Sequence, residues 1–288
     1  MPPFYLALTF GDSTWVVQQD LQSRWTVTPS LSADGGLVAS AHPVSGASAQ
    51  SGSLVVSLWS RSDRRRADVD AFQIEGGAVA LSPDGGRVAC VTGYRTNAPS
   101  RLEVFDRKTG KVVQGPEVYE RAGTDISWAP DSRHLAFDMG SNGAPVKANP
   151  SPLRVIYVMD TDTGTMRRIA KGVAPAWAPS GEWIAYLDYV PDNDDADSGF
   201  AAERPNRVIV MHPDGSGARV LVTWPREEGL MTAPVWSPDS RAILINRWHD
   251  RDKGAVNVDR IDAGTGTMSR LFRNVPPVYA WLKNATGE

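Results

Sequence analysis

Trp128-Ala129-Pro130-Asp131-Ser132 is one of five similar stretches that decide the fold of this 288-residue chain. The other four are Leu31-Ser32-Ala33-Asp34-Gly35, Ala80-Leu81-Ser82-Pro83-Asp84-Gly85, Trp177-Ala178-Pro179-Ser180-Gly181 and Trp236-Ser237-Pro238-Asp239-Ser240. The residues aligned with Asp131 lie 50, 47, 49 and 59 positions apart, and an apolar strand follows each full copy. A recurrence near fifty residues, built from a strand, a tight turn and a strand, is typical of β-propeller blades.

The copy around Trp128 predicts four strands within one repeat, which we call a to d. They span residues 125–128, 135–138, 154–159 and 166–169. Strands b and c are nearly unbroken apolar runs, as expected where neighbouring blades cover both faces of a middle strand. Strand d instead carries arginines, and charged residues on an outer edge discourage edge-to-edge aggregation.

Five such copies run from about residue 31 to 274, and a lone sixth strand a follows at 277–282. The missing strands b, c and d are available at the other end of the chain, at 4–9, 14–18 and 24–28. Closing a ring with one C-terminal and three N-terminal strands removes both open sheet edges. We therefore predict an all-β, six-bladed β-propeller with four-stranded antiparallel blades. Residues 1–288 then form a single domain, with blades at about 31–75, 76–121, 122–172, 173–224 and 225–274, and a closing blade from 4–28 and 275–284.

Composition narrows the function classes without choosing a compartment. A net charge of −3 and a pI near 5.9 argue against nonspecific nucleic-acid binding. No apolar run approaches the roughly 18 residues that a membrane span needs, so we expect no direct membrane insertion. The chain as given shows no signal peptide, which fits a cytosolic protein or the mature part of an exported one. Cys90 is the single cysteine, and we expect it to fill the core.

The tandem Trp-Ser/Ala-Pro-Asp turns, followed by turns such as Asp106-Arg107-Lys108-Thr109-Gly110, resemble the WD40-like repeats of the TolB family. The likeness extends over essentially the whole chain and reaches, more distantly, the propeller caps of prolyl oligopeptidases. The α/β domain of TolB and the hydrolase domain of the oligopeptidases have no counterpart here. The resemblance implies a noncatalytic bacterial scaffold, periplasmic or extracellular, that binds a protein or peptide partner. We expect it to act as a monomer without a cofactor.

The two ends of the predicted propeller differ in the length of their connections. The a–b and c–d turns share one end, the turn face, and are short and similar. The b–c and d–a connections share the other end, the loop face, and vary in length; they span 42–51, 141–153, 190–206, 249–254, 117–124 and 225–231. Long loops on one rim of a rigid scaffold are where binding is usually built, so we predict the binding site there. The alternative is that these loops drifted in length without a function.

The candidate binding residues are those that lie just past strand b or just before strand a, near the loop-face mouth of the central channel. They are Tyr94, Arg95, Asp125, Asp188, Tyr189, Arg247, His249 and Asp250. Tryptophans that recur at one repeat position, such as Trp128 and Trp236, are expected to pack in the core. Trp224 and Trp248 end strands beside the loop face and are the better aromatic ligand candidates.

An enzyme is the alternative to a scaffold. A lyase or hydrolase acting on a carbohydrate or small molecule could use Asp125, Asp138, Asp188 and His249 at the channel mouth. The sequence contains no nucleophile elbow and no histidine pair at metal-ligand spacing, so we assign no catalytic residue and no metal ligand. Residues 192–199 are rich in oxygen ligands, but their spacing favours a solvated acidic loop over a structural calcium site.

Overall fold

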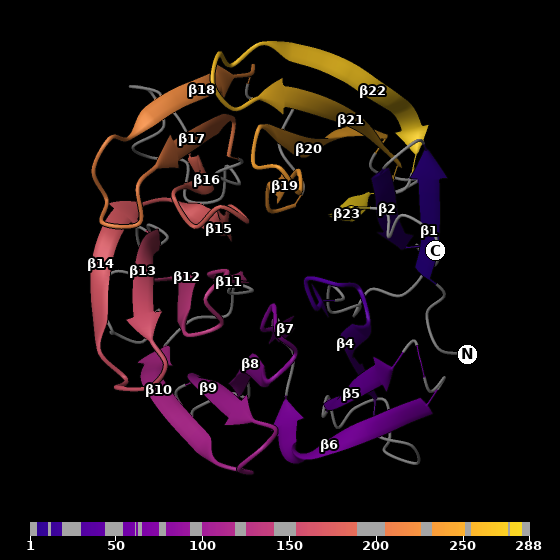
Figure 1. Cartoon of the computed structure of the whole chain (residues 1–288). Helices are drawn as coiled ribbons and strands as arrows, with labels where there is room; N and C mark the ends of the chain where they lie inside the picture. Colours follow the sequence, from indigo (N-terminus) through magenta and orange to yellow (C-terminus); the bar gives the residue numbers. More distant parts are fainter. Residues whose placement is uncertain are drawn as a thin grey trace.

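The computed structural model describes residues 5–10, 13–18, 30–43, 54–60, 62, 65–74, 79–92, 100–118, 125–140, 154–188, 205–225, 232–250, 255–275 and 277–283. These residues form β-strands arranged in sheets around a common centre (Figure 1). The part of the chain so described holds no helix with the length and apolarity needed to cross a membrane.

Five of the sheets are four-stranded, antiparallel and continuous in sequence, and we number them as blades 1 to 5. Blade 1 contains β3 (Ser30–Leu31), β4 (Leu37–Pro43), β5 (Leu54–Ser60) and β6 (Arg65–Ile74). Blade 2 contains β7 (Val79–Leu81), β8 (Arg87–Thr92), β9 (Ser100–Asp106) and β10 (Val112–Val118). Blade 3 contains β11 (Ile126–Trp128), β12 (His134–Gly140), β13 (Arg154–Asp160) and β14 (Met166–Lys171).

Blade 4 contains β15 (Val173–Trp177), β16 (Ile184–Asp188), β17 (Arg207–Met211) and β18 (Arg219–Thr223). Blade 5 contains β19 (Val235–Trp236), β20 (Ala242–Asp250), β21 (Ala255–Asp262) and β22 (Met268–Val275). The first strand of each blade lies near the centre of the ring and the last lies at its rim (Figure 1). The prediction of an all-β propeller with four-stranded antiparallel blades is confirmed.

The two chain ends meet in a sixth sheet that has three described strands. β23 (Val278–Lys283) pairs with β2 (Ser13–Gln18), and β2 pairs with β1 (Tyr5–Phe10). The order differs from the one that chain order suggested, because β2 and not β1 lies beside the C-terminal strand. Residues 24–28, predicted as a third N-terminal strand, lie outside the described residues.

The hydrophobic core is divided among the seams between neighbouring blades. One cluster of buried residues fills each seam from blade 1 round to the closing sheet. Strand β8 shows how one strand serves two seams: Val88 and Cys90 pack toward blade 1, while Ala89 and Val91 pack toward blade 3. Side chains alternate between the faces of a strand, so a strand buried on both sides needs an unbroken apolar run. Cys90 is buried as core filler, as the sequence predicts.

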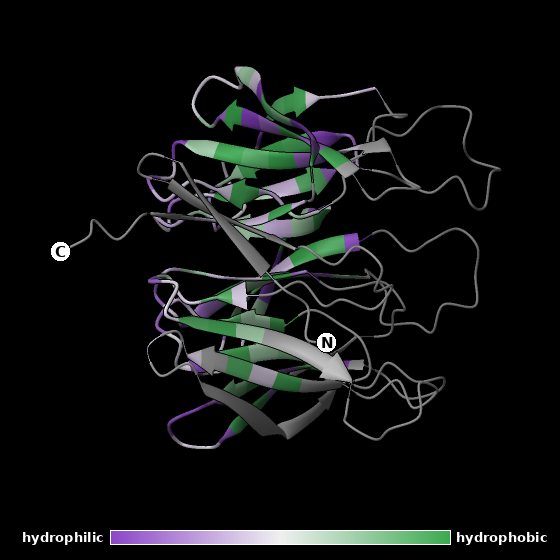
Figure 2. Ribbon diagram, turned by 90° about the vertical axis from the view of Figure 1, so that its right-hand side faces the viewer, coloured by the Kyte–Doolittle hydropathy of each residue, from purple (hydrophilic) through white to green (hydrophobic). Residues whose placement is uncertain are grey.

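The repeated a–b turn is held by its own serine and aspartate. In blade 5 the Ser237 hydroxyl donates to Asp239 Oδ1 at 2.6 Å and accepts from the Ala242 amide at 2.9 Å. Asp239 Oδ1 also accepts from the Arg241 amide at 3.0 Å. The Ser237 hydroxyl and the Arg241 amide keep the pKa of Asp239 below its usual value. These bonds satisfy the turn amides and explain why the Ser-Pro-Asp pattern recurs. Hydrophilic turns of this kind gather at the turn face, and hydrophobic strands lie between them and the loop face (Figure 2).

A serine hydroxyl joins the inner strands of two of the seams. Ser30 Oγ accepts from the Leu81 amide at 2.9 Å, which links blade 1 to blade 2. Ser127 Oγ accepts from the Trp177 amide at 2.8 Å, which links blade 3 to blade 4. Inner strands of neighbouring blades belong to different sheets, so no sheet ladder joins them. These serines therefore fix the position of one blade relative to the next along the axis of the ring.

A tryptophan indole makes the corresponding link in the two seams between these. Trp128 Nε1 donates to the Ala80 carbonyl at 3.0 Å, which links blade 3 to blade 2. Trp236 Nε1 donates to the Ala176 carbonyl at 2.9 Å, which links blade 5 to blade 4. Where the preceding strand carries alanine instead of serine, its carbonyl accepts from the tryptophan of the following blade. The expectation that the recurrent tryptophans pack in the core therefore holds for Trp128 and Trp236, and their indoles also hydrogen bond across the seam.

The same two seams carry a second link at the turn face. Ser132 and Ser240 adopt left-handed backbone conformations, with φ of 56° and 60°. Ser132 Oγ accepts from the Asp84 amide at 3.1 Å, and Ser240 Oγ accepts from the Ser180 amide at 2.9 Å. Glycine would adopt this conformation without strain but would offer no hydroxyl. The other three turns have glycine at this position: Gly35, Gly85 and Gly181.

We predict that Trp128→Phe lowers the free energy of unfolding by about 0.5–1.5 kcal/mol, because it removes the hydrogen bond from the indole to the Ala80 carbonyl across the seam. Trp177→Phe is the matched control. Its indole donates to Gly181 in its own turn at 3.2 Å and is only half-buried, so the loss should be smaller. Urea unfolding followed by fluorescence measures both values. Equal losses in the two variants would contradict the role given to the cross-seam bond.

Candidate functional site

An arginine–aspartate pair recurs at the loop-face end of three consecutive blades. In blades 3 and 4 the aspartate lies near the end of strand b and the arginine opens strand c, whereas in blade 5 the arginine lies within strand b and the aspartate within strand c. The pairs are Asp138–Arg154 in blade 3, Asp188–Arg207 in blade 4 and Arg247–Asp259 in blade 5. The pairs of blades 3 and 4 therefore lie beside the strand ends that flank residues 141–153 and 189–206. The arrangement fixes where these connections begin and places charge at the loop face.

The blade 3 group places two carboxylates beside one guanidinium. Asp138 Oδ2 accepts from Arg154 Nε at 2.6 Å, and Asp138 Oδ1 accepts from the Asp125 amide at 2.9 Å. Asp138 is 1% exposed. Asp125 is half-buried and directly precedes the inner strand β11, so it lies at the loop-face mouth of the channel. Both oxygens of Asp138 therefore have donors, while Arg154 is the guanidinium that balances both carboxylates.

This crowding changes the acidity of Asp125. Burial and the neighbouring Asp138 carboxylate raise the pKa of Asp125 to about 7, and the Arg154 guanidinium acts in the opposite direction. Among the described strands, β7, β12 and β15 pack most closely against β11, and neither β7 nor β15 contains a titratable residue. Asp125 can therefore hold or release a proton near neutral pH, which is the property that a general acid or base needs.

The blade 4 pair is more open to solvent. Arg207 Nη2 donates to Asp188 Oδ2, and their side chains are 25% and 20% exposed. Burial and the negative charge of Asp188 raise the pKa of the nearby Tyr186 to about 12, so Tyr186 stays protonated as a donor. Asn206 extends this strand end, since its amide donates to the Trp224 carbonyl at 2.9 Å. The pair thus offers partly exposed charges of both signs at the loop face.

The blade 5 group is a buried Arg–Asp–Arg triad at the seam with blade 4. Asp259 is fully buried and accepts from Arg247 Nε at 2.5 Å and from Arg270 Nε. The Arg247 guanidinium lies over the indole of Trp224, 5.8 Å from the ring centroid. Trp224 follows the last strand of blade 4, so the contact joins the two blades at their loop-face end.

The backbone between blades 3 and 4 is strained close to these groups. Gly172 and Ala174 have φ of 144° and 53°, and a Cβ on Gly172 would lie 2.6 Å from the Tyr186 ring. Positive φ at a buried alanine costs free energy that the surrounding packing must offset. The strain comes from a d–a connection with a single residue between β14 and β15. It brings the inner strand of blade 4 directly against the blade 3 group.

The structure describes three of the predicted binding side chains in full. Asp125 precedes β11, Asp188 ends β16, and Arg247 lies within β20. Asp125 and Asp188 are at the loop face as predicted, and each contacts a charged neighbour in its own blade. Arg247 is instead buried in a seam, because β20 extends further than the apolar run Ile243–Ile245 indicated. Tyr94, Arg95 and Tyr189 lie outside the described residues, as do the side chains of His249 and Asp250.

Sequence reasoning missed the partners of these residues. Arg154 and Arg207 each open strand c of their blade, and Asp259 lies within the apolar strand c of blade 5. An arginine at the first position of strand c, following an aspartate near the end of strand b, was the available signal in blades 3 and 4. The reversed order in blade 5 carried no such signal.

No group of metal-ligating side chains gathers within the described part of the chain. The acidic segment 192–199 lies outside that part. The expectation that residues 192–199 form a solvated acidic loop, and not a calcium site, therefore stays a prediction.

Comparison with family models finds no match. Among curated proteins, the chain is similar to the uncharacterized peptidase YuxL of Bacillus subtilis (strain 168), at 32% identity over 111 residues. The matched segment covers 36% of this chain and 16% of that protein. The chain thus corresponds to a small part of that relative's length.

Among solved structures, the fold is similar to TolB from Acinetobacter baumannii, with a TM-score of 0.63 and 16% identity over 93% of this chain and 62% of that one. A protein assigned as TolB from Agrobacterium tumefaciens gives a TM-score of 0.62 and 18% identity, covering 93% and 88%. An oligogalacturonate lyase in complex with manganese gives 0.57 and 16%, covering 94% and 73%. These likenesses show the fold, which is that of the TolB-like propellers.

We predict that the stability of the protein falls as pH rises from about 4 to about 7, in a way that depends on Asp125. Its pKa in the folded protein is about 7, above the usual 3.8, so the folded state binds the proton more tightly between these values. Asp125→Asn should remove about 2–4 kcal/mol of this pH dependence, since one pKa unit corresponds to about 1.4 kcal/mol. Urea unfolding of both proteins between pH 4 and pH 8 measures it. An unchanged slope in the variant would contradict the assignment.

We also predict that the two ion pairs differ in their importance for stability. Arg154→Met leaves the buried Asp138 carboxylate without its guanidinium and should cost about 3–5 kcal/mol. Arg207→Met breaks a partly exposed pair and should cost about 0–1 kcal/mol. Adding Asp138→Asn to Arg154→Met should recover part of the loss. Denaturant unfolding at pH 7.5 tests this, and similar losses for the two single variants would refute it.

Proposed function

We propose that this TolB-like propeller is a noncatalytic binding scaffold that engages a protein or peptide partner on its loop face and at the channel mouth. The carrying observation is the contrast between its two ends. The turn face is held together by short turns that hydrogen bond across the seams. The loop face bears the long b–c connections of blades 3 and 4, residues 141–153 and 189–206, each flanked by an ion pair between the two strands that it joins. A rigid body with variable connections at one end suits recognition.

The charges at the loop face suit a polar partner. Asp188 and Arg207 are partly exposed, and Asp125 adds a carboxylate at the channel mouth. Partly exposed charges of both signs favour selective contacts and faster association more than high affinity. The TolB structures share the fold of this chain, and this likeness of fold is the support that they give to the scaffold function. We propose further that the chain acts as a monomer.

A second candidate function is a lyase or hydrolase acting on a carbohydrate or small molecule at the channel mouth. The observation that favours it is Asp125, whose pKa of about 7 beside Asp138 suits a general acid or base. The similar fold of an oligogalacturonate lyase adds a precedent for chemistry on such a propeller. A substrate-dependent activity abolished by Asp125→Asn would support this function over the scaffold.

We propose a complete ring of six blades. The sixth blade would combine β23 with three N-terminal strands, as the sequence predicts. The described three-stranded sheet supports this closure by joining both chain ends.

The scaffold function is tested with binders selected from a random peptide display library against the purified chain. Peptides selected on the wild type should lose about tenfold or more in affinity for Asp188→Lys, because the substitution places a second cation beside Arg207. Arg133→Ala on the turn face is the matched control, since it also removes a partly exposed ion pair, with Asp160. Binders that respond to Arg133→Ala and not to Asp188→Lys would contradict the proposal.

A further inference from the structure

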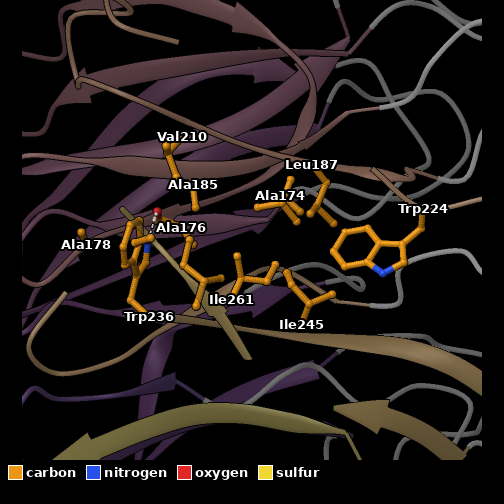
Figure 3. Packing of buried hydrophobic residues seen from close by; sticks show 13 residues of the cluster. Ala174, Ala176, Ala178, Ala185, Leu187, Val210, Trp224, Trp236, Ile245 and Ile261 are labelled. Carbon is orange, nitrogen blue, oxygen red and sulfur yellow. Dashed lines mark hydrogen bonds between the residues drawn. The ribbon is translucent and has the colours of Figure 1, made fainter. Parts of the chain in front are cut away.

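The seam between blades 4 and 5 contains two buried tryptophans, one at each end of its hydrophobic cluster (Figure 3). At the turn-face end, Trp236 Nε1 donates to the Ala176 carbonyl. At the loop-face end, Trp224 is only 5% exposed, and its Nε1 has no hydrogen-bond partner among the described residues. The indole of Trp224 lies beside Ile245 of blade 5 (Figure 3). The two indoles share one seam but differ in whether their N–H group is satisfied.

A second unsatisfied polar atom lies close by. Asn257 Oδ1 is buried and also lacks a partner within the described part of the chain. Asn257 lies directly opposite Arg247 in the β20–β21 ladder, just as Asp259 lies opposite Ile245. Directly opposed residues share one face of an antiparallel sheet, so all four side chains face blade 4. Arg247 contacts the Trp224 indole on this face. Trp224 Nε1 and Asn257 Oδ1 therefore belong to one polar region at the end of the seam.

The chemistry of these two atoms specifies what would satisfy them. The indole N–H can only donate, and the amide oxygen can only accept. With the Asn257 amide in its assigned orientation, a carboxylate could serve the first but not the second, and an ammonium group the second but not the first. A hydroxyl group both donates and accepts, so it suits both. It would also suit Asn257 with its amide rotated, because the hydroxyl oxygen would then accept from the amide nitrogen.

We propose that the loop-face end of the seam between blades 4 and 5 is a subsite for a small molecule that carries hydroxyl groups, a neutral sugar or polyol. Its hydroxyls hydrogen bond to Trp224 Nε1 and to the Asn257 amide. The region meets solvent beside Arg270, which is 25% exposed, and beside the exposed Pro225. A buried water offers the same hydroxyl chemistry, so the experiment must separate the two sources. The subsite is independent of the protein-binding function.

The test follows the indole N–H signals of the protein labelled with nitrogen-15. The Trp224 signal is assigned as the one that Trp224→Phe removes, and the Trp236 signal is the internal control. Titration with glycerol and with glucose, galactose and mannose should shift the Trp224 signal saturably and leave the Trp236 signal in place. Affinity for the best sugar should fall about tenfold in Trp224→Phe, which keeps an aromatic ring but loses the donor. Trp183→Phe, at the turn face of blade 4, should bind as the wild type does.

Two results would overturn the proposal. The first is an absence of any saturable shift at Trp224 with every probe, including the case in which the Trp224 indole shows a cross-relaxation signal to a long-lived water. That signal would assign the hydroxyl to a buried water alone. The second is equal sugar affinity in the wild type and Trp224→Phe, with Trp224→Phe shown to be folded by its remaining indole signals. Neither result bears on peptide binding at Asp188, so the two proposals stand or fall separately.

Discussion

Hydrogen bonds between the inner strands of neighbouring blades hold the ring in register. Apolar side chains fill the seams, but apolar contact is non-directional and would tolerate one blade sliding against the next. The bonds from Trp128 to Ala80 and from Leu81 to Ser30 remove that freedom, because a shift of a few ångströms would break them. Because the blades are held in register, the turns of the turn face also have fixed positions relative to one another. The same holds for the strand ends from which the loop-face connections start.

In blades 3 and 4 an ion pair joins the two strand ends from which the b–c connection starts, whereas the turn face is held by hydrogen-bonded turns. Asp138 is buried and both of its oxygens accept hydrogen bonds, so the ion pair of blade 3 is held in one geometry. Asp188 and Arg207 are partly exposed, so breaking the ion pair of blade 4 to bind a ligand costs less free energy than breaking the pair of blade 3. Adjacent blades thus combine one group suited to fixing geometry with one suited to binding.

The sequence predicted the repeat, the strands and the turn face because each depends on local chemistry that recurs. The Ser237–Asp239 turn needs only residues within one short stretch, and the apolar run at Val88–Val91 needs only neighbours on both sides. The candidate site was harder to predict because its contacts join different strands or blades. Asp125 was found from its position before an inner strand, but the Trp224–Arg247 contact depends on how two blades meet. The order of β1 and β2 was missed for a similar reason, since antiparallel pairing alone allows either strand beside β23.

The links across the seams alternate around the ring. Serine hydroxyls join blade 1 to 2 and blade 3 to 4, whereas indoles join blade 2 to 3 and blade 4 to 5. Ser132 and Ser240, at positive φ, follow the same alternation. An odd blade therefore presents a different surface to its successor than an even blade does. In these bonds the unit that repeats around the ring is therefore a pair of blades, twice the length of the approximately fifty-residue sequence repeat.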